Sequence, residues 1–99
     1  MAQSNYDLFA HPNPFNPATT ISYQLVEDAM ISLAIFDMNG KLVRRLVEGE
    51  KSAGLYSIRW NANDAEQKAA SGLYVYRLIA TPINGGQTFR ASEKLLLTK

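Results

Sequence analysis

The chain has 99 residues, of which 46% are apolar, and this length has room for a single domain with a single core. Ten Lys and Arg residues are balanced by nine Asp and Glu residues, so the formal net charge of +1 excludes the broad positive field that draws proteins to nucleic acid or to an anionic membrane. Because cysteine is absent, disulfides, thiolate metal ligands and thiol nucleophiles are all excluded.

A proline-rich loop opens the predicted domain. Residues 11–17 hold three of the four prolines, and each proline fixes its own φ and pushes the preceding residue towards extended geometry. We therefore expect a stiff entry loop, with residues 1–10 as a linker or N-terminal extension before it. Alternating apolar and polar residues then predict one strand from Thr20 to Leu25 and a second from Ile31 to Asp37.

The middle of the chain predicts a hairpin followed by another strand. Asn39-Gly40 is a pair that tolerates positive φ, so it favours a turn into a third strand from Leu42 to Val47. The polar, glycine-bounded stretch over residues 48–54 is expected as a loop. A fourth strand follows, with Tyr56, Ile58 and Trp60 on one side, and we expect Trp60 to anchor the core.

The last third predicts a loop and two further strands. Residues 61–71 are polar and small, which indicates a loop, with one helical turn as the alternative. The segment from Leu73 to Ala80 is apolar on both faces, as in a central strand, and its Tyr74, Tyr76 and Leu78 are expected to face the core. The turn residues 84–86 lead to a final strand over 87–97, where Glu93 interrupts the apolar face and so predicts a nearby β-bulge.

The spacing of these elements indicates the fold class. Six clear strands and a weaker one recur about every 8–12 residues, and no segment has helical periodicity. We therefore predict an all-β protein, an immunoglobulin-like antiparallel β-sandwich of about seven strands. The Cys…Trp…Cys pattern of antibody domains is missing, which excludes an antibody-type domain but not the wider class.

Groups that carry out chemistry are scarce. The only histidine, His11, sits in the proline loop, so a hydrolytic triad or a histidine-ligated zinc site has little support. We expect no enzyme activity, no catalytic residue and no cofactor. Residues 61–66 include four side chains with oxygen atoms, which are Asn61, Asn63, Asp64 and Glu66. Oxygen ligands suit calcium, so a weak calcium site is the alternative to a solvated loop here.

The aromatic residues raise a second functional hypothesis. Sandwich modules can bind sugars by stacking them on exposed rings, but most of the aromatic side chains here fall on inward positions of the alternation. Tyr6, Phe9 and Phe36 are the best exceptions. If these three rings are exposed together, a structural or carbohydrate-binding module appended to a secreted hydrolase is favoured.

Five segments occur in a recognisable order, and their spacing makes the set more specific than any one of them. They are Pro12 to Ile21, Ile35 to Val43, Gly54 to Tyr56, Ser71 to Leu78 and Lys94 to Lys99. Over about residues 11–99 the chain resembles the type A C-terminal sorting domain of the type IX secretion system. It also resembles the related immunoglobulin-like domain of flagellar hook-capping proteins, although the closing Lys-Leu-Leu-Leu-Thr-Lys counts against a role in a flagellar cap.

The resemblance implies a secretion role for residues 11–99. A non-catalytic sorting signal of this kind directs a larger cargo protein, to which it is covalently joined, from the periplasm across the outer membrane to the cell surface or the medium. The implied partners are the outer-membrane secretion machinery and its processing peptidase, which would cut within residues 1–10. No run of apolar residues approaches the ~20 needed for a transmembrane segment.

The resemblance also implies which residues take part in recognition. In the sequence these are Lys94, Leu95, Leu96, Leu97 and Lys99 in the last strand, Pro12, Asn13 and Pro14 in the entry loop, and Gly54, Tyr56, Gly72 and Tyr74 at the starts of two strands. The last strand is expected to offer its edge to a receptor by strand addition. The structural alternatives are closure of the sandwich by the last strand, a rigid chain entry at the prolines, and backbone geometry at the glycines.

Overall fold

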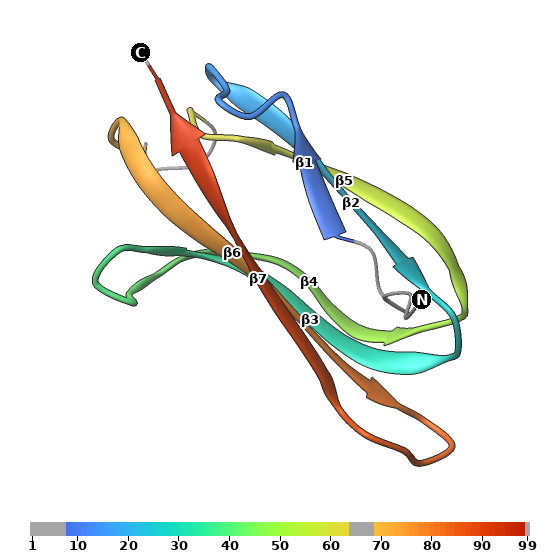
Figure 1. Cartoon of the computed structure of the whole chain (residues 1–99). Coiled ribbons are helices and arrows are strands. Elements are labelled where there is room, and N and C mark those ends of the chain that lie inside the picture. The colour runs from blue at the N-terminus through green and yellow to red at the C-terminus, as the bar shows by residue number, and fades with distance from the viewer. Residues whose placement is uncertain (1–7, 64–68, 99) are drawn as a thin grey trace, which may run out of the picture.

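A computed structural model describes residues 8–63 and 69–98, which form two antiparallel sheets packed face to face (Figure 1). The strands are β1 (Leu8–His11), β2 (Ala18–Leu25), β3 (Ala29–Asp37), β4 (Leu42–Lys51), β5 (Gly54–Asn61), β6 (Gly72–Pro82) and β7 (Phe89–Leu97). One sheet has the order β1-β2-β5 and the other the order β4-β3-β6-β7. The predicted all-β, seven-stranded antiparallel sandwich is confirmed. The described residues contain no helix long and apolar enough to cross a membrane.

The core lies between the two sheets, where alternate residues of each strand point inward. In β2 every second side chain is buried, and in β6 the buried positions include Tyr74, Tyr76 and Leu78, as the alternation predicts. Trp60 of β5 is only 4% exposed, so its predicted role as a core anchor is confirmed. Leu95 and Leu97 of β7 close the core from the edge of the four-stranded sheet.

The hairpin between β3 and β4 forms where the Asn-Gly pair predicts it. The Asp37 backbone N–H donates to the Lys41 carbonyl at 2.9 Å, and Gly40 adopts a φ of 83°, which a residue with a side chain rarely adopts. The Asp37 carboxylate accepts hydrogen bonds from the backbone N–H groups of Asn39 and Lys41, both at 2.9 Å. The turn is therefore held by its own first side chain.

Three details differ from the sequence-based expectations. β1 pairs with β2 from Leu8 to His11, although residues 1–10 were expected to be a linker or extension. The sequence did not predict this strand because four residues are too few to show a clear alternation. β4 continues to Lys51, so the loop expected from residue 48 is wrong there; this edge strand carries mostly exposed or half-buried side chains. The predicted bulge near Glu93 is also wrong, because the β6–β7 register is unbroken and the irregularities lie between β3 and β4.

Candidate interaction surface at the closing strand

The proline segment lies along the outer edge of β7. The Asn13 side chain uses both ends of its amide there: Nδ2 donates to the Lys94 carbonyl at 3.0 Å, and Oδ1 accepts from the Leu96 N–H at 3.0 Å. A side-chain amide has one donor face and one acceptor face, so it pairs with the strand as a backbone peptide group would. Residues 12–17 are hereafter called the proline clasp.

Phe15 continues this pairing with its backbone. Its N–H donates to the Leu96 carbonyl at 2.9 Å, and its carbonyl accepts from the Thr98 N–H at 2.9 Å, which forms a parallel bridge between Phe15 and Leu97. The ring of Phe15 is 2% exposed and lies 5.4 Å from the Trp60 ring between centroids. The clasp is thus joined to β7 by its backbone and to the core by one aromatic side chain.

Both ends of the clasp are also tied to the rest of the sandwich. The Thr19 hydroxyl, in a residue only 1% exposed, donates to the Pro12 carbonyl at 2.7 Å. The Ala62 N–H donates to the Pro17 carbonyl at 2.9 Å. Since prolines have no N–H of their own, Pro12 and Pro17 bond to the rest of the sandwich through their carbonyls. The stiff entry loop predicted from the prolines is therefore fastened at both of its ends.

The pairing changes what β7 offers to a partner. The strand edge from Lys94 to Thr98, expected to be open for strand addition, is already occupied by Asn13 and Phe15. Leu95 and Leu97 are buried, whereas Lys94 is exposed and Leu96 is half-buried. In this segment a partner would therefore meet Lys94 and Leu96 beside the clasp. Lys99 lies outside the described residues.

The two Gly-Leu-Tyr segments share one local structure. Gly54 and Gly72 open β5 and β6 with φ of 155° and 142°, and the leucine after each glycine is exposed. Two residues after each glycine, the tyrosine hydroxyl donates to a carbonyl four residues upstream, from Tyr56 to Ser52 and from Tyr74 to Ala70. Each tyrosine therefore pins the loop that precedes its own strand, much as a tyrosine corner does in immunoglobulin-like domains.

The structure gathers most, but not all, of the predicted recognition residues. Gly72 and Tyr74 pair with Leu97 and Leu95, so they lie at the same end of the sandwich as the clasp. Tyr74 also packs against Trp60, with ring centroids 5.8 Å apart and an edge-on geometry. Gly54 pairs with Leu25 at the opposite end of its sheet, away from the clasp, and Tyr56 lies near it.

Sequence reasoning assigned no recognition role to Phe15 or Thr98 and did not connect Asn13 with β7. The Asn13–Lys94 contact spans 81 positions of sequence, and no local pattern encodes it. One signal was present: Phe15 is the only large apolar residue within the clasp, which indicates a side chain that inserts into the core.

The other candidate sites receive less support from the geometry. In the 61–66 loop, Asn61 Oδ1 accepts from the Asn63 N–H at 2.8 Å, while Asp64 and Glu66 lie outside the described residues. Within residues 8–63 and 69–98, no three His, Cys, Asp or Glu side chains gather as metal ligands would. His11 is exposed at the end of β1.

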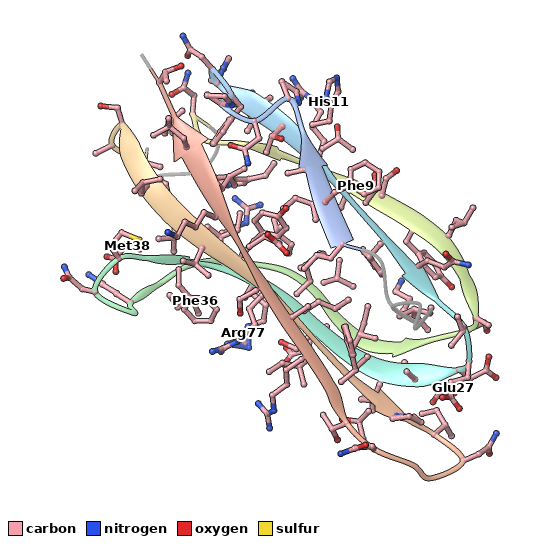
Figure 2. All side chains as sticks on the ribbon, in the orientation of Figure 1. Phe9, His11, Glu27, Phe36, Met38 and Arg77 are labelled. Atoms are coloured by element: carbon pink, nitrogen blue, oxygen red, sulfur yellow. The ribbon has the colours of Figure 1, made fainter. Side chains whose placement is uncertain are left out.

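The outward-facing aromatic rings do not form one platform. Phe9 pairs with Ser22 on the outer face of the three-stranded sheet, whereas Phe36 pairs with Val75 in the other sheet. Figure 2 shows the two rings on separate sides of the sandwich, with Phe36 beside Arg77. Tyr6 lies outside the described residues. The joint exposure that would favour a sugar-stacking surface is therefore not found for Phe9 and Phe36.

The perturbed titrating groups are tyrosines of the core. Burial, with a smaller contribution from the nearby Glu93 carboxylate, raises the pKa of Tyr76 to about 12. Burial also raises the pKa of Tyr23 and of Tyr74 above the usual value, with smaller effects from Tyr56 and Asp37. These shifts keep the phenols neutral, which suits packing rather than nucleophilic chemistry.

Comparison with known proteins gives a family and a fold. The family model of the FlgD Ig-like domain matches residues 15–82, a range that ends before β7. No curated protein sequence matches the chain. Among solved structures, the crystal structure of dimeric latent PorU from Porphyromonas gingivalis is similar, with a TM-score of 0.71 and 20% sequence identity. That match covers 98% of this chain but only 10% of the PorU chain, so it concerns the fold of one part of a much longer protein.

Proposed function

The chain belongs to the FlgD Ig-like domain family, and we propose that it is a non-catalytic sorting domain that directs a covalently attached cargo protein across the outer membrane through a type IX secretion system. One observation carries the proposal. Two of the segments that resemble such sorting domains, Pro12 to Ile21 and Lys94 to Lys99, lie at opposite ends of the sequence, yet the clasp and β7 meet in one hydrogen-bonded unit. A shared surface of this kind gives a reason for both segments to belong to one signal.

The proposed signal is a folded surface rather than a linear peptide. Leu95 and Leu97 are buried, so a receptor cannot contact their side chains unless the strand unfolds. Lys94 and Leu96 face outward beside Asn13 and are the side chains that a receptor would contact. In this proposal the domain passes through the periplasm with its cargo, meets the outer-membrane machinery and its peptidase, and reaches the cell surface or the medium.

An export assay tests the proposal. Residues 5–99 are fused behind a signal peptide and a reporter in a bacterium with this secretion system, and reporter on the cell surface is compared with reporter in the periplasm. Deleting residues 94–99 should leave the reporter in the periplasm. That deletion also removes the buried Leu95 and Leu97, however, and so disturbs the fold. A substitution that spares the buried Leu95 and Leu97 is therefore needed.

The sharper variant is Lys94→Ala combined with Leu96→Ser, which leaves the buried leucines in place. Its matched control is Lys41→Ala combined with Leu42→Ser, an exposed lysine and leucine at the β3–β4 hairpin. We expect the first variant to hold the reporter in the periplasm and the control to export it. If circular dichroism shows that both double variants are folded and both are exported equally, the proposed recognition surface at Lys94 and Leu96 is contradicted.

One observation supports a second candidate function, carbohydrate binding. A shallow groove of about 340 Å³ on the three-stranded sheet is lined by Phe9, Ser22, Leu55 and Ser57 among others, and Phe9 is 56% exposed. An exposed ring beside hydroxyl groups can stack a sugar and bond its hydroxyls. Calorimetric titration with plant polysaccharides tests this alternative: heat that disappears in Phe9→Ala would support it, and no heat with the wild-type chain would reject it.

A further inference from the structure

The clasp covers only the last part of β7. The β6–β7 register runs without a break from Gly72 opposite Leu97 to Ala80 opposite Phe89. Leu96 directs both its N–H and its carbonyl towards the clasp, away from β6. In an antiparallel ladder this orientation repeats at every second residue, so Arg90 and Ser92 direct their backbone groups to the same outer side.

That upstream part of the edge is open. Among the described residues, no hydrogen bond from another strand or loop reaches the outward backbone groups of Arg90 or Ser92, and both side chains are exposed. The Lys94 carbonyl is taken by Asn13, but the Lys94 N–H is not. The N–H and carbonyl groups of Arg90 and Ser92, together with the Lys94 N–H, therefore form a row of unpaired backbone groups. An extended chain can add to a strand edge of this kind.

The side chains along this open edge are cationic. Arg90 and Lys94 lie two residues before and after Ser92, so all three share the outer face of the sheet, and Arg77 of β6 is directly opposite Ser92. The Arg77 guanidinium stacks over the Phe36 ring at 4.4 Å from its centroid, which fixes it on this face (Figure 2). Three cations therefore surround one small hydroxyl residue.

The nearby carboxylates do not neutralise these cations. Glu93 belongs to the opposite face of β7, where its charge raises the pKa of Tyr76. Asp37 accepts two backbone hydrogen bonds within its own turn. Glu48, on the far edge strand, pairs with Arg45 at 3.3 Å. The outward positions of β6 and β7 carry no acidic side chain, so the charge of this face is complementary to an acidic partner.

We propose that residues 90–94 of β7 bind an extended acidic segment of a partner protein by strand addition. A second copy of this chain fits poorly, because antiparallel pairing of two β7 edges about Ser92 places Arg90 of each copy opposite Lys94 of the other. An acidic segment turns the same positions into attractive cross-strand pairs. Since Arg90 and Lys94 are four residues apart, the best partner has two acidic residues four positions apart on one face.

A designed peptide supplies the probe. Acetyl-Thr-Asp-Val-Thr-Val-Asp-Thr-amide places Asp, Thr and Asp on one face, and because its central five residues read the same in both directions it fits either strand orientation. Binding to the 99-residue chain is followed by NMR, with amide exchange as a second readout. We expect the amide signals of Arg90, Ser92 and Lys94 to shift and their exchange to slow at least about tenfold, because these N–H groups gain partners.

Matched controls separate backbone pairing from charge. A peptide with Asn in place of both Asp residues should bind at least about tenfold more weakly at low salt, and added salt should weaken the acidic peptide. Ser92→Pro removes an outward N–H without removing a bond to β6, and proline is tolerated at such edge positions, so this variant should lose binding while Ser92→Ala keeps it. The Arg90→Glu, Lys94→Glu double variant should prefer the corresponding Lys peptide.

Two results would overturn the proposal: equal binding of the acidic and neutral peptides, or undiminished binding by folded Ser92→Pro. If Ser92→Pro does not fold, the charge-reversed variant decides, since a failure to switch its preference rejects the assigned surface. This inference stands apart from the export role, because peptide binding is measured on the isolated chain. Failure of the export assay and failure of the peptide titration are therefore distinguishable.

Discussion

Replacement of Asn13 by alanine removes the side-chain link between the clasp and β7. The wild-type side chain makes two hydrogen bonds of 3.0 Å, to the Lys94 carbonyl and from the Leu96 N–H. At about 0.5–1.5 kcal/mol of net stability for each bond, the expected loss is roughly 1–3 kcal/mol. We place it in the lower half of that range, because both bonds lie at an exposed edge where water can replace the lost partner.

Urea unfolding and amide exchange measure this effect together. With a slope of about 1–2 kcal/mol per molar urea, the midpoint should fall by roughly 1 M. The Leu96 amide should exchange at least about tenfold faster, because its acceptor is gone. Asn13→Asp keeps the Leu96 acceptor but loses the donor to Lys94, so it should be destabilised near neutral pH and regain part of the loss below about pH 4, when its carboxyl group can donate again.

Asn16→Ala is the matched control, since Asn16 is an exposed asparagine of the same segment whose side chain makes no described hydrogen bond. It should change stability by less than about 0.5 kcal/mol. The reasoning is refuted if Asn13→Ala is as stable as this control and the Leu96 amide keeps its exchange rate. In that case the backbone bonds of Phe15 are enough to join the clasp to β7.

Two further predictions concern the core behind the clasp. Phe15→Ala should cost about 3–5 kcal/mol in a urea titration because the ring is 2% exposed, whereas Phe9→Ala, at an exposed ring, should cost far less; equal costs would contradict the packing. For Tyr76, the folded pKa of about 12 lies above the usual 10, so the neutral phenol stabilises the fold at pH values below 10 and that stability is lost as pH rises from 10 to 12. Tyr76→Phe should make thermal stability fall less steeply over this range; an unchanged pH profile would exclude Tyr76 as its source.

The elements with a strong local pattern could be predicted from the sequence. Alternation marks β2 and β3, an apolar run marks β6, and the Asn39-Gly40 pair marks the hairpin, because strand pattern and turn conformation are properties of adjacent residues. Trp60 follows the same alternation into the core. The limits of β4 were less accessible, because the polar residues 48–51 of an edge strand look like a loop.

The clasp could not be predicted in the same way. Prolines in residues 12–17 indicate stiffness, but the partner of that segment is β7, and the contact between Asn13 and Lys94 joins residues 81 positions apart. The sequence-based recognition residues Gly54 and Gly72 prove to begin strands at positive φ, beside tyrosines that hold loops. The open edge at Arg90 and Ser92 became apparent only when the extent of the clasp was known.

The central claim is that the folded surface formed by the clasp and β7 directs export. The most direct measurement is the protease-accessible fraction of a reporter fused to residues 5–99, in a strain with the type IX secretion system and in the same strain lacking its outer-membrane channel. The account predicts surface reporter in the first strain and periplasmic reporter in the second. It also predicts periplasmic reporter in the first strain when the fusion carries Lys94→Ala with Leu96→Ser. Surface reporter in the channel-deficient strain, or periplasmic wild-type fusion in the competent one, would contradict it.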